Sequence, residues 1–144
     1  MQKTKVKILV FGTFDGLHKG HLDFFKQARK LAERSFLIVS VARDKNVKRI
    51  KGQAPKLGEE KRLALIKKCI LVNRAVLAGL ENYLPHILKE SPNIIALGYD
   101  QKAYVKNLKE DLKNKGLIVK IMRLKSYKEH IYKNHLLKER NLLQ

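Results

Sequence analysis

Short apolar runs alternate with amphipathic patterns along most of this chain, and this alternation constrains the fold more than any other feature. Five apolar runs are predicted as strands, at residues 5–11, 36–42, 75–78, 93–97 and 117–123. The segments between them include residues 20–33 and 59–70, which carry apolar residues at helical spacing. The pattern predicts an α/β fold, a Rossmann-like doubly wound parallel five-stranded sheet with helices on both faces.

The remaining segments complete one predicted domain of residues 1–144, which is an ordinary length for a single domain. Further helices are predicted at 84–89 and 103–115, the second closed by Gly116. Residues 43–58 are predicted to be a basic loop that contains Gly52 and Pro55. Residues 124–144 are interpreted as a C-terminal tail that is helical from 132 to 143.

The composition limits the expected disulfides, membrane spans and cellular location of the protein. Cys69 is the only cysteine, so an internal disulfide is excluded. No apolar stretch approaches the roughly 20 residues that span a bilayer, and the N-terminus lacks the pattern of a signal peptide. A cytoplasmic location without membrane partners is therefore expected.

The net charge of +19 favours polyanionic partners, among them nucleotides and RNA. The lysines are spread along the chain, as they are on an ordinary solvated basic surface. The charge alone therefore identifies no partner.

Ligands of doubly wound sheets bind beyond the carboxyl ends of the strands, where the strand order reverses. This rule directs attention to the loops that follow Phe11, Ala42 and Leu97. The sequence is unusual in all three.

The first loop, residues 12–21, reads GTFDGLHKGH and matches neither the dinucleotide fingerprint nor the P-loop. Gly12 allows a sharp turn, and Gly20 allows backbone to approach a ligand at the start of the next helix, where free N–H groups suit phosphate. His18 and His21 share a face and could donate hydrogen bonds that stabilise charge on a triphosphate during attack. Zinc is the rival use of two histidines, but no third ligand is evident nearby.

In the other two loops, Lys48 and Lys51 are candidates to reach the β- and γ-phosphates, although the same loop could simply be solvated. Arg62, at the next helix start, is predicted either to pin that helix or to contact substrate. After the fourth strand, Gly98 permits close approach of a ligand. Asp100 could accept hydrogen bonds from a ribose or base, or cap a helix.

The first loop resembles the signature of the cytidylyltransferase-like nucleotidyltransferases, whose HxGH motif is here His18 to His21 after Gly-Thr-Phe-Asp. The resemblance implies Mg²⁺-dependent use of ATP or CTP with release of pyrophosphate. Asp15 is a candidate metal or water contact, and bracing of the loop is its alternative role.

The segments Val-Ala-Arg-Asp…Ile-Lys-Gly and Ala-Leu-Gly-Tyr-Asp-Gln are similar to those of archaeal-type FAD synthases, which transfer AMP from ATP to FMN. The implied ATP-site residues are Thr13, Phe14, His18, Lys19, Gly20, His21 and Asp100, with Tyr127 added by position. The family's Ser/Thr-rich motif is replaced by Asn134 and His135, which could still cap a helix and donate to phosphate.

The predicted mechanism is in-line attack by an acceptor phosphate, with adenine near Gly98 to Asp100. His18, His21 and Lys51 stabilise the transition state. A cytidylyltransferase acting on glycerol 3-phosphate or a similar acceptor is the alternative enzyme. A basic RNA-binding module is the alternative of another class, and a 7% aromatic content without an RNA-binding signature argues against it. The family often forms dimers, and Ile87 and Leu143 are proposed as exposed apolar positions for an interface.

Overall fold

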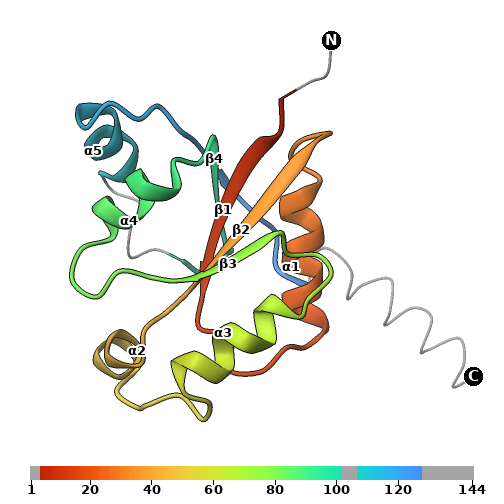
Figure 1. Cartoon of the computed structure of the whole chain (residues 1–144), viewed down its shortest axis with the longest axis vertical. Helices are drawn as coiled ribbons and strands as arrows, with labels where there is room; N and C mark the ends of the chain where they lie inside the picture. Colours follow the sequence, from red (N-terminus) through yellow and green to blue (C-terminus); the bar gives the residue numbers. More distant parts are fainter. Residues whose placement is uncertain (1–3, 102–106, 128–144) are drawn as a thin grey trace, which may run out of the picture.

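A computed structural model describes residues 4–101 and 107–127. Its strands are β1 (Val6–Gly12), β2 (Ser35–Val41), β3 (Arg74–Leu77), β4 (Ile94–Leu97) and β5 (Lys120–Arg123). Its helices are α1 (Lys19–Arg29), α2 (Asp44–Lys51), α3 (Glu59–Lys67), α4 (Tyr83–Glu90) and α5 (Leu108–Asn114). The strands form one sheet in the order β3-β2-β1-β4-β5, and every pair is parallel (Figure 1). The predicted five-stranded parallel sheet is confirmed.

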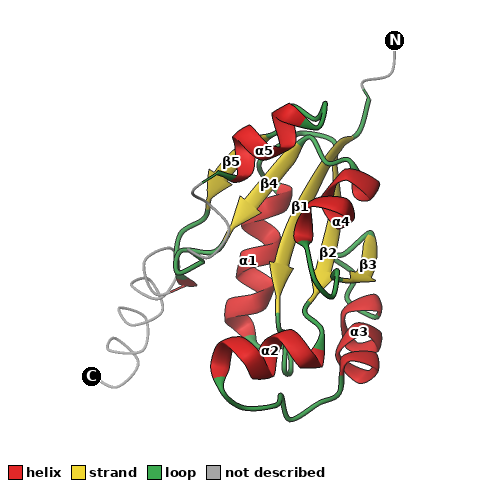
Figure 2. Cartoon of the chain, turned by 90° about the vertical axis from the view of Figure 1, so that its left-hand side faces the viewer, coloured by secondary structure: helices red, strands yellow, loops and turns green. Residues whose placement is uncertain are grey.

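Helices cover both faces of the sheet (Figure 2). Successive residues of a strand point to opposite faces, so the apolar run of β1 is buried on both sides. Ile8 and Val10 pack with the buried residues of α1 and α3, whereas Leu9 packs with those of α4 and α5. This two-sided burial explains why the central strands β1, β2 and β4 are mostly apolar in the sequence.

The order of the strands reverses at β1, which lies between β2 and β4. The loops that follow these three strands therefore meet at one edge of the sheet, which we call the carboxyl edge. Helix α2 lies across this edge, beyond the ends of the strands (Figure 2). The loops singled out in the sequence thus come together in space.

Helix α2 contradicts the prediction of a basic loop over residues 43–58. Only Val47 of its eight residues is buried, so the helix leaves almost no apolar stripe in the sequence. Its boundaries are set by polar signals instead. Asp44 lies in the first turn, and Gly52 ends the helix with a φ of 78°, a conformation that glycine adopts at low cost.

Other predictions meet mixed outcomes. Gly116 follows α5 with a φ of 91°, as expected for a closing glycine, but residues 102–106 of the predicted helix lie outside the described residues. The same holds for the predicted helical tail and for Leu143. Ile87 was proposed as exposed and is fully buried against the sheet, so that prediction is wrong. No helix in the described part has the length and apolar character to cross a membrane.

Candidate active site

The loop after β1 folds back on itself around Phe14. This residue has a φ of 53°, and its ring is 4% exposed. A Cβ atom at Gly12 would lie 2.4 Å from the ring, so only glycine leaves room for it. The ring contacts Phe25 in the core and meets the edge of the His21 ring, with centroids 5.3 Å apart. The Phe14 side chain thus packs in the core and supports His21, and its predicted contact with the nucleotide stays a prediction.

The two imidazoles of the first loop are held by the start of α1. His18 is the N-cap residue, and its Nδ1 accepts a hydrogen bond from the Gly20 N–H at 3.0 Å. The His21 Nδ1 accepts one from the His18 N–H at 3.3 Å. The rings stack with centroids 3.7 Å apart. The prediction that both imidazoles share one face at a helix start is confirmed.

This capping geometry fixes which ring nitrogen of each histidine carries the proton. A nitrogen that accepts a backbone N–H bears no proton, so both neutral rings are protonated at Nε2. Neither Nε2 has a hydrogen-bond partner among the described residues. The loop therefore presents two adjacent N–H donors at the positive end of a helix, an arrangement suited to phosphate oxygens.

His21 is neutral at physiological pH. Its partial burial is the main reason that its pKa falls to about 4, and the nearby charges of His18 and Lys51 lower the pKa further. The ring therefore acts as a neutral hydrogen-bond donor rather than as a cation. The effect of Lys51 also shows that this side chain lies within electrostatic range of His21.

We expect His21 to make the free energy of unfolding rise between pH 4 and pH 6.5. The unfolded chain binds a proton near pH 6.5, whereas the folded chain resists it down to about pH 4. This contribution is complete above pH 6.5 and is lost as the pH falls through the folded value. Urea unfolding at several pH values should show a shallower pH dependence for His21→Gln than for wild type. An imidazole titration midpoint near pH 6.5 for His21 in the folded protein would contradict the expectation.

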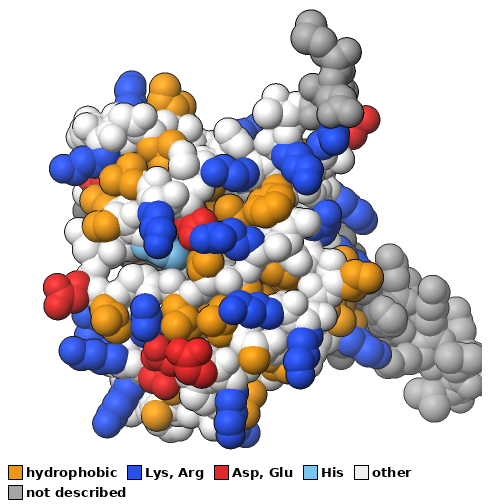
Figure 3. All heavy atoms as spheres, viewed as in Figure 1, with side chains coloured by type: hydrophobic (Ala, Val, Ile, Leu, Met, Phe, Trp, Pro, Cys, Tyr) orange, Lys and Arg blue, Asp and Glu red, His pale blue; other side chains and the backbone are white. Residues whose placement is uncertain are grey.

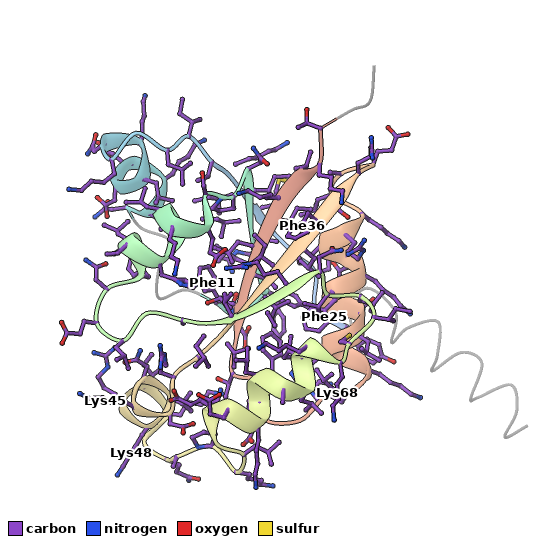
Figure 4. All side chains as sticks on the ribbon, viewed as in Figure 1. Phe11, Phe25, Phe36, Lys45, Lys48 and Lys68 are labelled. Carbon is purple, nitrogen blue, oxygen red and sulfur yellow. The ribbon has the colours of Figure 1, made fainter. Side chains whose placement is uncertain are left out.

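The loop after β2 brings Lys51 to the site. Lys51 lines a small pocket together with Thr13 and Asp15 of the first loop. Lys48 lies one turn earlier in α2, is exposed, and does not line this pocket (Figure 4). The structure therefore brings one of the two predicted phosphate-binding lysines to the first loop.

Arg62 connects the loops that form the carboxyl edge, and its guanidinium is fully buried. It donates hydrogen bonds to four acceptors: the carbonyls of Thr13 (2.8 Å), Ala42 (2.7 Å) and Leu57 (2.9 Å), and Asp44 Oδ1 (2.6 Å). Of the two roles predicted for Arg62, the structure shows the pinning one. It holds the first loop, the end of β2 and the start of α3 together.

Asp44 and Glu59 extend this network through reciprocal helix caps. The Glu59 carboxylate accepts the Asp44 N–H at 3.0 Å, and the Asp44 carboxylate accepts the Glu59 N–H at 3.2 Å. Each side chain thus caps the helix that begins with the other residue. These two bonds fix α2, and with it Lys51, relative to α3.

The loop after β4 is held to β1 and β5 by two side chains that were not predicted as site residues. Gln101 accepts the Gly98 N–H at 2.8 Å and donates to the Phe11 carbonyl at 2.8 Å. Arg123, the last residue of β5, donates to the carbonyls of Gly98, Tyr99 and Gln101. Asp100 lies in the same loop and is exposed. It does not cap α5, whose N-cap residue is Asn107.

Tyr127 lies beside the start of α1. A Cβ atom at Gly20 would lie 3.7 Å from the Tyr127 Cβ and only 2.9 Å from the His18 ring. The segment is tied to α1 by Gln27, which exchanges two hydrogen bonds with the backbone of Lys125. Tyr127 is thus close to the first loop, and its contact with the nucleotide stays a prediction. Asn134 and His135 lie outside the described residues.

Comparison with known families agrees with the geometry of the first loop. The sequence model of the cytidylyltransferase-like family matches residues 9–140. The chain belongs to this family.

Relatives of this cytidylyltransferase-like chain include FAD synthases. That of Aciduliprofundum boonei is 39% identical over 122 residues, covering 85% of this chain and 80% of that protein. That of Methanosarcina barkeri is 40% identical over 123 residues, covering 85% and 86%. A crystal structure described as a lipopolysaccharide core biosynthesis protein from Thermoplasma volcanium has a TM-score of 0.77 and 37% identity, covering 85% and 98%. The chain is a nucleotidyltransferase with the fold predicted from its sequence.

A cytidylyltransferase-like enzyme raises the question of where Mg²⁺ would bind. The described residues contain no group of three or more His, Cys, Asp or Glu side chains that could hold a metal ion. Both Asp15 oxygens accept backbone N–H groups, from Lys56 at 2.6 Å and Leu57 at 2.7 Å. These bonds lower the pKa of Asp15 and show the loop-bracing role named as its alternative. Asp15 therefore braces the loop, and its contact with a metal ion stays a prediction.

Proposed function

We propose that this nucleotidyltransferase is an FAD synthase, which transfers AMP from ATP to FMN and releases pyrophosphate. The stacked pair of Nε2–H donors at the start of α1 carries the proposal of nucleotidyl transfer. The choice of ATP and FMN is supported by the FAD synthases that are 37–40% identical to the chain.

In the proposed reaction, an oxygen of the FMN phosphate forms a bond to the α-phosphorus of ATP. The bond from that phosphorus to the bridging oxygen of the β-phosphate breaks, and pyrophosphate leaves. The attacking phosphate is already ionised, so no strong general base is needed. Catalysis then depends on positioning and on stabilising negative charge.

His18 and His21 supply the fixed donors for this charge. Their Nε2–H groups are set by the helix cap before substrate arrives, so no reorganisation is needed during the reaction. Lys51 adds a positive charge from the opposite side of the first loop. Mg²⁺, when bound, would neutralise phosphate charge, and its ligands would be phosphate oxygens and water rather than a dedicated cluster of side chains.

The loop after β4 is proposed to hold the nucleoside. Gln101 and Arg123 fix its backbone beside β1, and Gly98 leaves space where a side chain would otherwise stand. Asp100 is exposed there and can accept hydrogen bonds from a ribose or a base. Thr13, Lys19, Gly20 and Tyr127 are proposed to complete the nucleotide site around the first loop. Contacts from Asn134 and His135 remain a prediction.

An assay with matched substrate pairs tests the proposed function. With Mg²⁺, the protein should form FAD and pyrophosphate from ATP and FMN, and chelation by EDTA should stop the reaction. CTP with glycerol 3-phosphate should give little product under the same conditions. Faster formation of CDP-glycerol than of FAD would overturn the choice of substrates and leave nucleotidyl transfer intact.

RNA binding is the alternative that the charge of +19 favours. Figure 3 shows Lys and Arg side chains scattered over the visible face rather than gathered into one stripe. RNA binding with a steep salt dependence, together with no release of pyrophosphate from ATP, would support this alternative. The cytoplasmic location and the dimer stay predictions, the second open to test by sedimentation.

A further inference from the structure

A small pocket opens between the first loop and the segment that follows α2. Its volume is about 200 Å³, and it is lined by Thr13, Asp15, Val47, Lys51, Gln53, Ala54, Pro55 and Lys56. Sites that enclose a whole drug-sized ligand usually measure about 300–1,000 Å³. The pocket is therefore suited to a phosphate or pyrophosphate group rather than to a nucleoside.

The lining of this pocket carries two lysines with no ion-pair partner among the described residues. Lys51 and Lys56 are both exposed, and neither ammonium group has a hydrogen bond to a described side chain or carbonyl. The only acidic residue of the lining is Asp15, whose two oxygens are engaged by backbone N–H groups. The pocket thus offers a ligand two cations, and its one carboxylate is already hydrogen-bonded to the backbone.

Lys51 links the pocket to the histidine pair. It lines the pocket and its charge also acts on His21, so the pocket lies within electrostatic range of the histidine pair. Thr13 lines the same pocket and belongs to the loop that carries both histidines. A phosphate bound here would therefore contact the same loop that carries the histidines of the proposed reaction.

We propose that this pocket is a phosphate subsite in which Lys56 is a phosphate-binding residue and Asp15 is the positioning residue that builds it. The inference rests on the proposed function for the identity of the substrates. Two groups share the required chemistry: the leaving pyrophosphate of the nucleoside triphosphate, and the phosphate of the acceptor. The experiment below distinguishes them.

Asp15 builds the subsite through two hydrogen bonds to a segment that is distant in the sequence, and we call this pair of bonds the latch. Its carboxylate accepts the N–H groups of Lys56 and Leu57, which are 41 and 42 residues away in the sequence. These two bonds hold residues 53–56 against the first loop. Without them the segment between Gly52 and Gly58 has few restraints, since most of its residues are exposed. The latch therefore places Lys56 opposite Thr13.

Lys56→Ala tests the subsite, with Lys45→Ala as its matched control. Lys45 is exposed on α2 and does not line the pocket (Figure 4). Lys56→Ala should weaken binding of the occupying group about three- to tenfold, a range that allows for solvent screening of an exposed charge. If the leaving group occupies the pocket, KM for ATP and the inhibition constant of pyrophosphate should rise. If the acceptor phosphate occupies it, KM for FMN should rise instead.

The latch is tested by combining variants. In an Asp15→Ala background Lys56 is no longer held in the pocket. Adding Lys56→Ala should then change the KM or inhibition constant that Lys56→Ala alone affects by less than twofold. Asp15→Asn retains one acceptor oxygen and should give an intermediate effect, and it replaces the alanine variant if that one does not fold. The Mg²⁺ concentration for half-maximal activity should stay unchanged in both Asp15 variants if Asp15 acts as a positioning residue, and should rise if Asp15 is a metal ligand.

Direct measurement of anion binding distinguishes an error in this inference from an error in the proposed function. Calorimetric titration of pyrophosphate, and separately of inorganic phosphate, requires no turnover. If the protein makes no FAD but Lys56→Ala weakens anion binding and Lys45→Ala does not, the subsite stands and the proposed function falls. If FAD is made and the two lysine variants behave alike in every constant, the subsite is wrong. Fully additive effects of Asp15→Ala and Lys56→Ala would overturn the latch.

Discussion

Replacing His18 by asparagine should lower kcat about 100- to 1000-fold and change the free energy of unfolding by less than about 0.5 kcal/mol. In the structure His18 has two separable roles. Its Nδ1 caps α1 by accepting the Gly20 N–H, and its Nε2–H is available to a ligand. Asparagine is among the best N-cap residues, so the cap survives the change. The donor at the Nε2 position is lost.

Alanine at the same position removes both roles. His18→Ala should lose a similar factor in kcat and also about 1 kcal/mol of stability, the usual contribution of a helix cap. The double alanine variant of His18 and His21 should lose still more turnover. Because the two rings stack and share one cap, their effects on kcat are not expected to add.

Initial rates with saturating substrates, together with urea unfolding curves, would measure both effects. Circular dichroism of each variant serves as the control that α1 remains folded. If His18→Asn kept wild-type kcat, the Nε2–H donor would have no part in the reaction and the histidines would be structural caps alone. If the double alanine variant kept full activity, the active site would lie elsewhere.

Much of the fold was predictable because its central strands, β1, β2 and β4, are buried on both faces. Continuous apolar runs such as that of β1 leave a clear signal, and the alternation with helices then fixes a parallel sheet. Helix α2 was missed because Val47 is its only buried residue. Its N-terminal cap comes from Glu59, which is 15 residues from Asp44 and meets it only in the folded chain.

The part of the candidate site that is formed by residues close together in the sequence was predictable. His18 and His21 share one helical turn, so their proximity follows from spacing alone. The burial of Phe14 was not predictable, because it depends on a left-handed backbone conformation that non-glycine residues rarely adopt. The role of Asp15 also depends on distant backbone groups, since its partners belong to Lys56 and Leu57.

The largest loss of stability is expected from Arg62→Met. The change removes a fully buried guanidinium and leaves three carbonyls and the Asp44 carboxylate without their shared donor. Breaking such a buried network typically costs about 3–5 kcal/mol. Arg62→Lys keeps the charge but cannot supply a planar set of donors to all four acceptors. Its free energy of unfolding should therefore lie between those of wild type and Arg62→Met. Urea unfolding at constant pH measures the difference.

Arg49→Met is the matched control, because Arg49 is exposed on α2 and has no bond to the network. Its effect should stay within about 0.5 kcal/mol, as for most surface changes. A loss below about 1 kcal/mol for Arg62→Met would mean that the loops of the carboxyl edge hold together without the guanidinium. The reciprocal caps of Asp44 and Glu59 would then be the main restraint on α2.

The pH dependence of stability separates the ionic part of this network from its hydrogen bonds. The hydrogen bond from Arg62 is the main reason that the pKa of Asp44 lies below its usual value of 3.8. The stability from this pair is therefore complete above pH 3.8 and is lost as the pH falls through the folded pKa. Wild type should lose stability more steeply than Arg62→Met below pH 3.8. Parallel curves would show that Arg62 stabilises the site through the carbonyls of Thr13, Ala42 and Leu57 alone.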